Sequence, residues 1–486
     1  MIDPAPPQSA DVVIVGGGVV GCCIARELAQ HDLRVVLLEK RGDVGAGTSG
    51  ANSAVIHSGI DPQPGTLKAA TNRAGVEAYP ALCEQLGVAL AATGGYIVAR
   101  DESERPVLDE RLERGRRNGV PGVRLINGEE LGEREPAVQG VAAVHIPTSG
   151  VVDVHQLVFG LAENAAQNGA VVCRECPVQA IGVANGQVAS VVTPAGEIAT
   201  RVAVNAAGVD ADEVAAMAGA GHFGITPRKG EYYVLDKAVR PVSSVIHPVP
   251  TERTKGICVI PTIDGNTLIG PTAHDVADKA DISTTEAGLA EAYAGAAGLC
   301  PSIELADVIA SYAGLRAVAG DDFIIGPTGV GGLINAAGIA SPGLTAAPAI
   351  AQRVASHVAD YLGPLRKRPE FDPVRRVTPR FGALSREEQG KLIAEDADHG
   401  EIVCRCETVT RAEIREAIRG PVGARTLDGV KYRTRAGMGR CQGGFCLPRI
   451  VRIFGEELGV SPAELTKFGA GSELFVPPER DTARSG

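Results

Sequence analysis

The sequence Asp11-Val-Val-Ile-Val15-Gly16-Gly-Gly-Val-Val-Gly21 opens the region that decides the fold. Its first five residues form a short run rich in β-branched residues that is followed by glycine, as in a buried parallel strand. Ile24 and Leu28 then recur at helical spacing, and Arg34-Val-Val-Leu-Leu-Glu39 repeats the strand pattern. The sequence therefore predicts a strand, a glycine-rich turn, a helix and a second strand.

The three glycines of the turn occupy the fixed positions of the pattern G-x-G-x-x-G. Gly16 permits a tight turn, Gly18 lets the backbone approach a pyrophosphate, and Gly21 lets the helix pack close to the strand. The phosphates would meet the free N–H groups of the helix N-terminus. Glu39 ends the second strand, where a carboxylate reaches an adenosine ribose. The pattern predicts dinucleotide binding, of FAD or NAD rather than NADP; the alternative is a purely structural turn.

Composition narrows the class of protein. The 486 residues suffice for two to four domains, and the net charge of −11 argues against a nucleic-acid-binding protein. No apolar run reaches the roughly 20 residues that would span a bilayer. The N-terminal residues lack a basic region followed by an apolar core, so we expect no signal peptide and a cytoplasmic protein. The sequence is also compatible with association with the inner face of a membrane and with formation of homo- or hetero-oligomers.

The loop after the second strand is rich in small and polar residues, Gly45-Ala-Gly-Thr-Ser-Gly-Ala-Asn-Ser-Ala-Val-Ile-His-Ser-Gly-Ile60. It resembles the flavin-contacting segment of the D-amino-acid-oxidase-like FAD superfamily. The resemblance is closer to the branch with glycerol-3-phosphate dehydrogenases and L-2-hydroxyglutarate dehydrogenase. This resemblance implies that the loop lines FAD. His57 would contact the flavin or the substrate; the alternative is a histidine that only hydrogen-bonds the backbone.

Two later stretches resemble other nucleotide motifs of this superfamily. Residues 201–210 form a strand that ends in small residues, and residues 338–343 form a turn before a helix over 344–362, whose dipole would raise the electron affinity of the flavin. The cofactor contacts implied are Gly16, Gly18, Val19, Val20, Gly21, Glu39, Lys40, Thr48, Ser49, Asn52, Ser53, His57, Ser58, Val178, Ala207, Gly208, Gly338, Ser341, Pro342, Gly343, Leu344 and Thr345.

The middle of the chain shows alternating strand patterns in Pro227–Leu235, Lys255–Pro261 and Thr267–Thr272. These segments also resemble the glycerol-3-phosphate dehydrogenase branch, in which such a sheet covers the flavin. The resemblance makes Arg316 the residue that binds the acidic group of the substrate, a task suited to the planar guanidinium. The other catalytic candidates are His57, Lys229, Tyr232 and Lys255. His57 is the first choice for the base because its ordinary pKa lies near neutrality.

Eleven cysteines, an odd number, favour reduced thiols. Cys404-Arg-Cys406 and Cys441-Gln-Gly-Gly-Phe-Cys446 form two pairs, and two residues that are i and i+2 on an extended segment point to one side. Residues 404–446 hold nine Arg or Lys and four Asp or Glu, an excess that would offset four thiolates. Four thiolates suit a 2Fe-2S cluster or zinc. The segment resembles the bacterioferritin-associated-ferredoxin-like domain, which implies a 2Fe-2S cluster on these four cysteines.

The expected fold is α/β: a Rossmann-type FAD domain interleaved with an α+β antiparallel-sheet substrate domain, followed by a small helical iron–sulfur domain. The expected boundaries are 1–364 for the oxidoreductase, 365–399 for a linker and 400–486 for the cluster domain. The FAD part covers about 1–65, 150–225 and 310–364, and the substrate part covers about 66–149 and 226–309.

The FAD domain and the cluster domain together imply an FAD-dependent dehydrogenase that oxidises a small anionic 2-hydroxy substrate. Glycerol 3-phosphate is the favoured substrate. Its electrons would pass through the cluster to a protein or quinone acceptor. L-2-hydroxyglutarate and amino acids or opines are the alternative substrates. An alternative of another class is a non-catalytic electron-transfer subunit.

Overall fold

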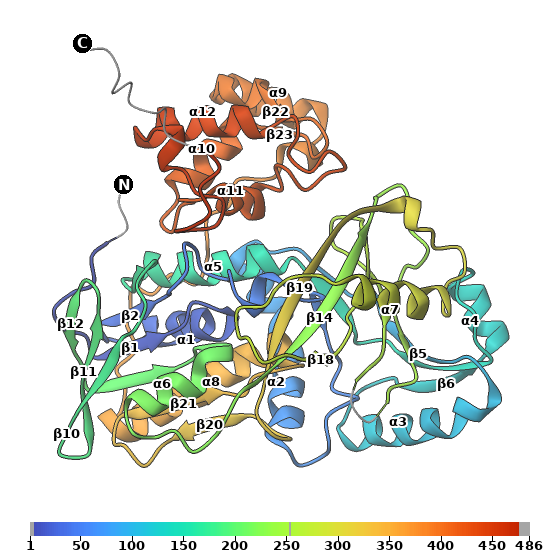
Figure 1. The fold of residues 1–486 in the computed structure, drawn as a ribbon, viewed down its shortest axis with the longest axis horizontal. Helices are drawn as coiled ribbons and strands as arrows, with labels where there is room; N and C mark the ends of the chain where they lie inside the picture. The colour runs from blue at the N-terminus through green and yellow to red at the C-terminus, as the bar shows by residue number, and fades with distance from the viewer. Residues whose placement is uncertain (1–3, 252–253, 476–486) are drawn as a thin grey trace, which may run out of the picture. The chain divides into compact units, whose positions relative to one another are not determined.

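The computed structural model describes residues 4–251 and 254–475, which fall into two compact units (Figure 1). Within these residues, the larger unit holds 4–40 and 44–377, and the smaller holds 41–43 and 378–475. The expected linker is divided between them. Residues 365–377 pack on the larger unit, where the Arg375 Nε lies 2.6 Å from a Glu163 carboxylate oxygen and Arg368 Nη1 donates to the Asn168 carbonyl at 2.5 Å.

A six-stranded sheet forms the base of the larger unit. The predicted strand–turn–helix–strand is confirmed, because β1 and β2 pair in parallel and α1 (Val19–Ala29) joins them. The sheet has the order β20-β21-β13-β1-β2-β9, in which only β20 is antiparallel to its neighbour. The strands are β1 (Val12–Val15), β2 (Val35–Leu38), β9 (Val171–Cys173), β13 (Val202–Asn205), β20 (Ile324–Pro327) and β21 (Leu333–Ala337).

Helices pack on this sheet and on one another. α1 contacts α5 (Val154–Gln167) and α8 (Gly343–Leu362), and α8 also contacts α2 (Leu67–Leu86). α2 and α8 approach so closely at Gly75 that a Cβ there would lie 1.9 Å from the carbonyl oxygen of Thr345. No helix of the described part is long and apolar enough to cross a membrane.

A nine-stranded sheet forms the substrate part. Its order is β18-β14-β17-β16-β15-β5-β7-β6, and β19 also pairs with β14; Figure 1 shows β14 and β19 as two long neighbouring strands. The predicted antiparallel sheet is confirmed, with one exception: β15 and β5, which come from separate parts of the chain, pair in parallel. The strands are β5 (Gly95–Ala99), β6 (Arg124–Asn127), β7 (Ala142–Ile146), β14 (Thr226–Leu235), β15 (Val245–Pro248), β16 (Cys258–Pro261), β17 (Thr267–Gly270), β18 (His274–Asp275) and β19 (Val308–Val318).

Short elements complete the larger unit. The strand-like residues 171–183 belong to two strands, β9 and β10, because Glu175 adopts a φ of 51° that bends the chain between them. The two small sheets are β10 (Ala180–Ala184), β11 (Gln187–Thr193) and β12 (Gly196–Ala199), and β3 (Val55–Ile56), β8 (Gly150–Val152) and β4 (Leu90–Ala91). The remaining helices are α3 (Arg105–Arg117), α4 (Gly128–Arg134), α6 (Ala211–Met217) and α7 (Glu286–Ala297).

The smaller unit is a helical domain with one hairpin. The sequence pattern Thr410-x-x-Glu413 is that of a capping box, and it forms at the start of α10: Thr410 Oγ1 accepts from Glu413 N, and Thr410 N donates to the Glu413 carboxylate. Ser461 is followed by a 3₁₀ turn, Pro462–Glu464, and the tail from Pro477 lies outside the described residues. The elements are β22 (Ile402–Cys404), β23 (Val409–Thr410), α9 (Arg386–Glu395), α10 (Arg411–Arg419), α11 (Leu427–Thr434) and α12 (Leu447–Leu458).

The contact at Gly75 predicts a stability effect. We expect Gly75→Ala to lower the free energy of unfolding by about 1–3 kcal/mol, because the methyl group would push α2 away from α8. The matched control is Gly132→Ala in α4, where an added Cβ meets nothing within 4 Å and should be neutral or stabilise by up to about 1 kcal/mol. Thermal unfolding followed by circular dichroism measures both; equal midpoints for the two variants would contradict the packing argument.

Candidate functional site

The glycine turn between β1 and α1 is closed by direct backbone contact. Gly16 has a φ of +109°, and a Cβ there would lie 2.4 Å from the Ala206 carbonyl oxygen. A Cβ on Gly21 would lie 1.9 Å from the Gly16 carbonyl oxygen. A Cβ on Gly18 would meet only the Ser49 hydroxyl, at 3.2 Å. The turn is therefore packed against the sheet at its first and third glycines and is open at its second, where a pyrophosphate would approach.

Several side chains expected to contact the cofactor also hold this region together. Glu39 Oε2 accepts from Gly17 N at 2.8 Å, so the carboxylate lies over the turn at the end of β2. Ser49 Oγ accepts from Val19 N at 2.9 Å and so fixes the loop beside the N-terminus of α1. Lys40 is half exposed and forms an ion pair with Asp210 at 2.7 Å.

The loop 48–58 is anchored from the substrate sheet. Thr48 Oγ1 donates to the Leu315 carbonyl at 2.5 Å, and Tyr312 Oη donates to the Asn52 carbonyl at 2.8 Å. Asn52 Nδ2 in turn donates to the Ser49 carbonyl at 2.8 Å, and Ser53 hydrogen-bonds the Tyr232 hydroxyl. These contacts keep an irregular small-residue loop in one conformation, as a flat ligand requires.

The second and third expected motifs border the same region. At Gly47 and Gly208 an added Cβ meets nothing within 4 Å, so both backbones face open space. The helix α8 begins at Gly343 with no side-chain cap. The remaining implied contacts of this motif, Gly338, Ser341, Pro342 and Leu344, lie on the turn or in the first turn of α8. Val178 is half buried and packs on an apolar cluster under the sheet. Tight glycines, open backbone and two helix N-termini fit a dinucleotide.

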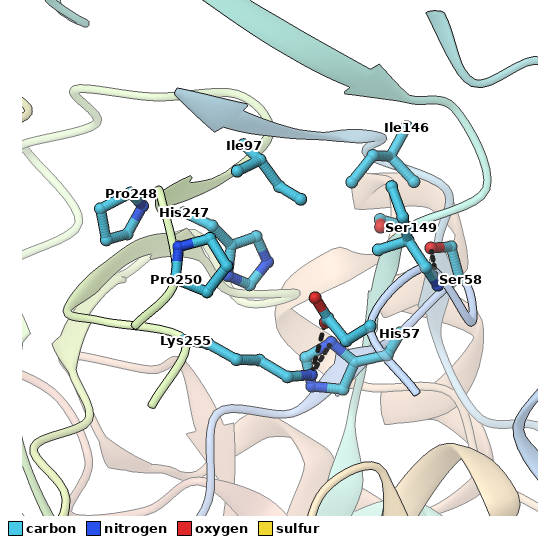
Figure 2. Close-up of a pocket in the computed structure, with 11 residues that line it drawn as sticks. His57, Ser58, Ile97, Ile146, Ser149, His247, Pro248, Pro250 and Lys255 are labelled. Carbon is cyan, nitrogen blue, oxygen red and sulfur yellow. Dashed lines mark hydrogen bonds and ion pairs between the residues drawn. The ribbon is translucent and has the colours of Figure 1, made fainter. Parts of the chain in front are cut away.

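A small pocket lies beside the loop that carries His57 (Figure 2). Its wall combines two histidines, a lysine, an aspartate and two serines with apolar side chains. It is lined by His57, Ser58, Ile60, Asp61, Ile97, Ile146, Ser149, His247, Pro248, Pro250 and Lys255. These residues come from the cofactor part and from the substrate sheet of the larger unit, as expected for a substrate cavity.

His57 is fixed by its backbone on both sides. Its N–H donates to Thr345 Oγ1 at 2.9 Å, and its carbonyl accepts from Asn72 Nδ2 at 2.6 Å. The side chain therefore reaches the pocket from an immobile peptide. Burial, the Lys255 cation and His247 lower the pKa of His57 well below 6.5, so the ring is neutral at pH 7.

Lys255 connects the polar groups of the pocket. Its Nζ lies 2.8 Å from an Asp61 carboxylate oxygen and 3.4 Å from His57 Nδ1, the contacts dashed in Figure 2. Burial would raise the pKa of Asp61, but the cation of Lys255 outweighs it and lowers that pKa. Because an ammonium group can only donate, His57 Nδ1 is the acceptor and the ring proton lies on Nε2.

His247 and Cys258 form a second contact behind these groups. His247 Nδ1 lies 3.0 Å from Cys258 Sγ, and the His57 and His247 rings are 6.1 Å apart. Burial lowers the pKa of His247 to about 4 and raises that of Cys258 to about 12, so both are neutral at pH 7. The cationic charge of the pocket therefore belongs to Lys255.

Arg316 lies on β19, opposite Arg228 of β14. Its guanidinium donates hydrogen bonds to backbone carbonyls, with Nη2 at 2.5 Å from the Thr272 oxygen. Among the described residues it has no carboxylate partner. Arg316 does not belong to the residues that line the pocket of His57 and Lys255. A partly buried, unpaired guanidinium suits an anionic ligand.

The other two candidates of the sheet have protein partners. Lys229 Nζ lies 2.8 Å from Asp281, and strand alternation places it on the face opposite Arg316. Tyr232 stacks on Tyr312 with ring centroids 4.6 Å apart. Burial raises the pKa of Tyr232 to about 12. We therefore assign Lys229 a structural ion pair and Tyr232 a role in holding the loop.

The four cysteines of the smaller unit meet as two pairs. Cys406 Sγ lies 3.6 Å from Cys441 Sγ, and a hydrogen bond from Cys446 lowers the pKa of Cys404 to about 6. The prediction of one extended segment is wrong at Cys406, which lies in the β22–β23 turn, where Thr408 has a φ of 54°. No group of three or more ligand side chains in the described chain could hold one metal ion. Four cysteines suit a 2Fe-2S cluster, with two thiolates for each iron.

The sequence analysis did not single out Asp61, His247 or Ser149. Asp61 could have been noticed as a carboxylate four residues after His57 in the same loop. His247 and Ser149 come from segments distant in sequence, and only the pairing of β15 with β5 and of β5 with β7 brings them to His57.

Comparison with known proteins identifies the families of the two units. Residues 11–357 match the family described as FAD dependent oxidoreductase, and residues 402–456 match the BFD-like [2Fe-2S] binding domain. The chain is 41% identical to glycerol 3-phosphate dehydrogenase of Caloramator mitchellensis, over 97% of this chain and 99% of that protein. It is 35% identical to glycerol 3-phosphate oxidase of Mycoplasma pneumoniae, over 71% and 93%.

Solved structures give the same result for the larger unit. L-alpha-glycerophosphate oxidase from Mycoplasma pneumoniae, solved with FAD bound, has a TM-score of 0.73 and 32% identity, covering 77% of this chain and all of that one. Glycine oxidase from Geobacillus kaustophilus has a TM-score of 0.67 and 26% identity, covering 76% and 100%. The chain belongs to the FAD-dependent oxidoreductases of this family and carries a C-terminal BFD-like 2Fe-2S domain.

Proposed function

We propose that the protein is a dehydrogenase that oxidises glycerol 3-phosphate at its secondary alcohol. The observation that carries this proposal is the 41% identity to a glycerol 3-phosphate dehydrogenase along both domains. The cationic pocket supports it, because the substrate is a small dianion. FAD supplies the acceptor for the hydride, and the product is dihydroxyacetone phosphate.

The pocket residues account for the proton and the charge. We assign His57 as the acceptor of the hydroxyl proton, because its ring is neutral; the substrate hydroxyl would replace the Lys255 ammonium at Nδ1, the ring atom that carries the lone pair. The Lys255 ammonium, held by Asp61, would stabilise the negative charge that develops on the substrate oxygen. Arg316 would bind the phosphate.

The direct test is product analysis of the holoenzyme with a one-electron dye as acceptor. Glycerol 3-phosphate should yield dihydroxyacetone phosphate. Turnover of L-2-hydroxyglutarate alone would contradict the proposal. It would favour the activity of the L-2-hydroxyglutarate dehydrogenase relative, whose match covers 55% of this chain. Turnover of amino acids alone would favour the glycine oxidase neighbours.

The electrons would leave through the 2Fe-2S cluster to a protein or quinone. A hydride carries two electrons together, whereas a 2Fe-2S cluster transfers one at a time. Cys404, Cys406, Cys441 and Cys446 would hold this cluster, which would supply one-electron transfer to the external acceptor.

A pH profile tests the role of His57. The pKa of His57 is lowered, so the neutral base persists as pH falls below 6.5 and is lost only below the lowered pKa. We expect kcat/KM to stay constant as the pH is lowered through 6.5. Lys255→Met removes one cause of the lowering, so the acid limb should move to higher pH while activity falls about a hundredfold or more. An acid limb at the same pH in both enzymes would contradict the assignment.

Arg316→Met tests the anion site. We expect kcat/KM for glycerol 3-phosphate to fall about a hundredfold, about 2.7 kcal/mol, mainly through a higher KM. The matched control is Arg228→Met on the facing strand, which loses only a half-exposed ion pair with Asp275. Bound FAD confirms that both variants fold. An equal KM in the two variants would count against phosphate binding by Arg316.

Cys406→Ser tests the cluster assignment. We expect the protein to lose its iron, about two atoms per chain, and the electron paramagnetic resonance signal of the reduced cluster, while FAD stays bound. The control is Cys176→Ala, a buried thiol beside the six-stranded sheet. Zinc in place of iron in the unaltered protein, or iron retained in Cys406→Ser, would refute the assignment.

A further inference from the structure

The cluster domain exposes one edge of its cysteine set. Cys404 and Cys446 are buried at 1% exposure, whereas Cys406 and Cys441 are exposed. A cluster held by these four thiolates would therefore be open to solvent at the Cys406–Cys441 side only. Because electron transfer weakens steeply with distance, an external carrier would approach at this side.

The exposed edge carries an unusual group of side chains. Phe445 is 46% exposed and lies between two guanidinium groups, with Arg405 at 4.8 Å and Arg449 at 5.0 Å from its ring centroid. We call this surface the cysteine face, which consists of Arg405, Cys406, Arg440, Cys441, Phe445 and Arg449. Large exposed aromatic rings and arginines are enriched in protein interfaces.

The charge of the cysteine face opposes that of the whole chain. Arg405 and Arg449 form no ion pair with the described residues. The neighbouring carboxylate of Glu407 is buried, at 4% exposure, in an ion pair of 2.8 Å with Arg435. The chain carries a net charge of −11. An acidic protein would therefore be repelled elsewhere and attracted here.

We propose that the cysteine face docks an acidic one-electron carrier protein. Each docking moves one electron: the reduced cluster loses it and returns to the oxidised form, and the carrier gains it. One two-electron substrate oxidation thus reduces two carriers. Two or three arginines suit carboxylates of a protein better than a lipid surface, which usually requires a cluster of about four to eight basic residues. The inference rests on the proposed function only in the direction of electron flow.

Binding to the oxidised holoprotein tests the proposal separately from substrate turnover. The probes are two acidic carriers, flavodoxin and plant-type ferredoxin, and one basic carrier, cytochrome c. We expect an acidic carrier to bind at low ionic strength and to dissociate as salt rises, and cytochrome c not to bind. Arg405→Glu combined with Arg449→Glu should weaken binding by about tenfold or more.

The matched control changes the same charge elsewhere. Arg116→Glu combined with Arg117→Glu alters two exposed arginines of α3, and binding should stay within about twofold. The absorption spectrum of the cluster confirms that both double variants retain it, and Phe445→Ala should also weaken binding. The proposal is overturned if neither acidic carrier binds, if both double variants bind alike, or if anionic phospholipid vesicles bind in their place through the same arginines.

Discussion

Thr345 links the packing of the larger unit to its pocket. The side chain is fully buried near the N-terminus of α8, and its carbonyl meets α2 at Gly75, where only a glycine leaves room. Its hydroxyl accepts the backbone N–H of His57. The close approach of two helices therefore also sets the position of His57 in the pocket, so helix packing and the proton transfer that we propose would depend on one residue.

The pocket then works through electrostatics. Lys255 carries the charge, Asp61 holds it in place, and the same cation keeps His57 neutral at pH 7. A neutral base beside a fixed cation suits the removal of a hydroxyl proton, because the base is free to accept it and the cation stabilises the oxygen that remains. The second unit adds four thiolates in two pairs, which suit the one-electron step that must follow.

Local patterns predicted the parts of the molecule that local forces determine. Gly16 and Gly21, the first strands and the capping box of Thr410 have short-range causes, and all are present. The parallel pairing of β15 and β5 has no local signal, so His247 could not be placed beside His57 from sequence. The position of Cys406 in a turn was not predicted, because Thr408 adopts a left-handed backbone conformation that the residue type does not indicate.

The central claim is that substrate oxidation reduces both cofactors of one chain. It is tested most directly by adding glycerol 3-phosphate to the anaerobic holoprotein and recording absorption and electron paramagnetic resonance spectra. The account predicts that the flavin band bleaches and that the signal of a reduced 2Fe-2S cluster appears. Flavin bleaching with a cluster that stays oxidised, although dithionite reduces it, would contradict the account.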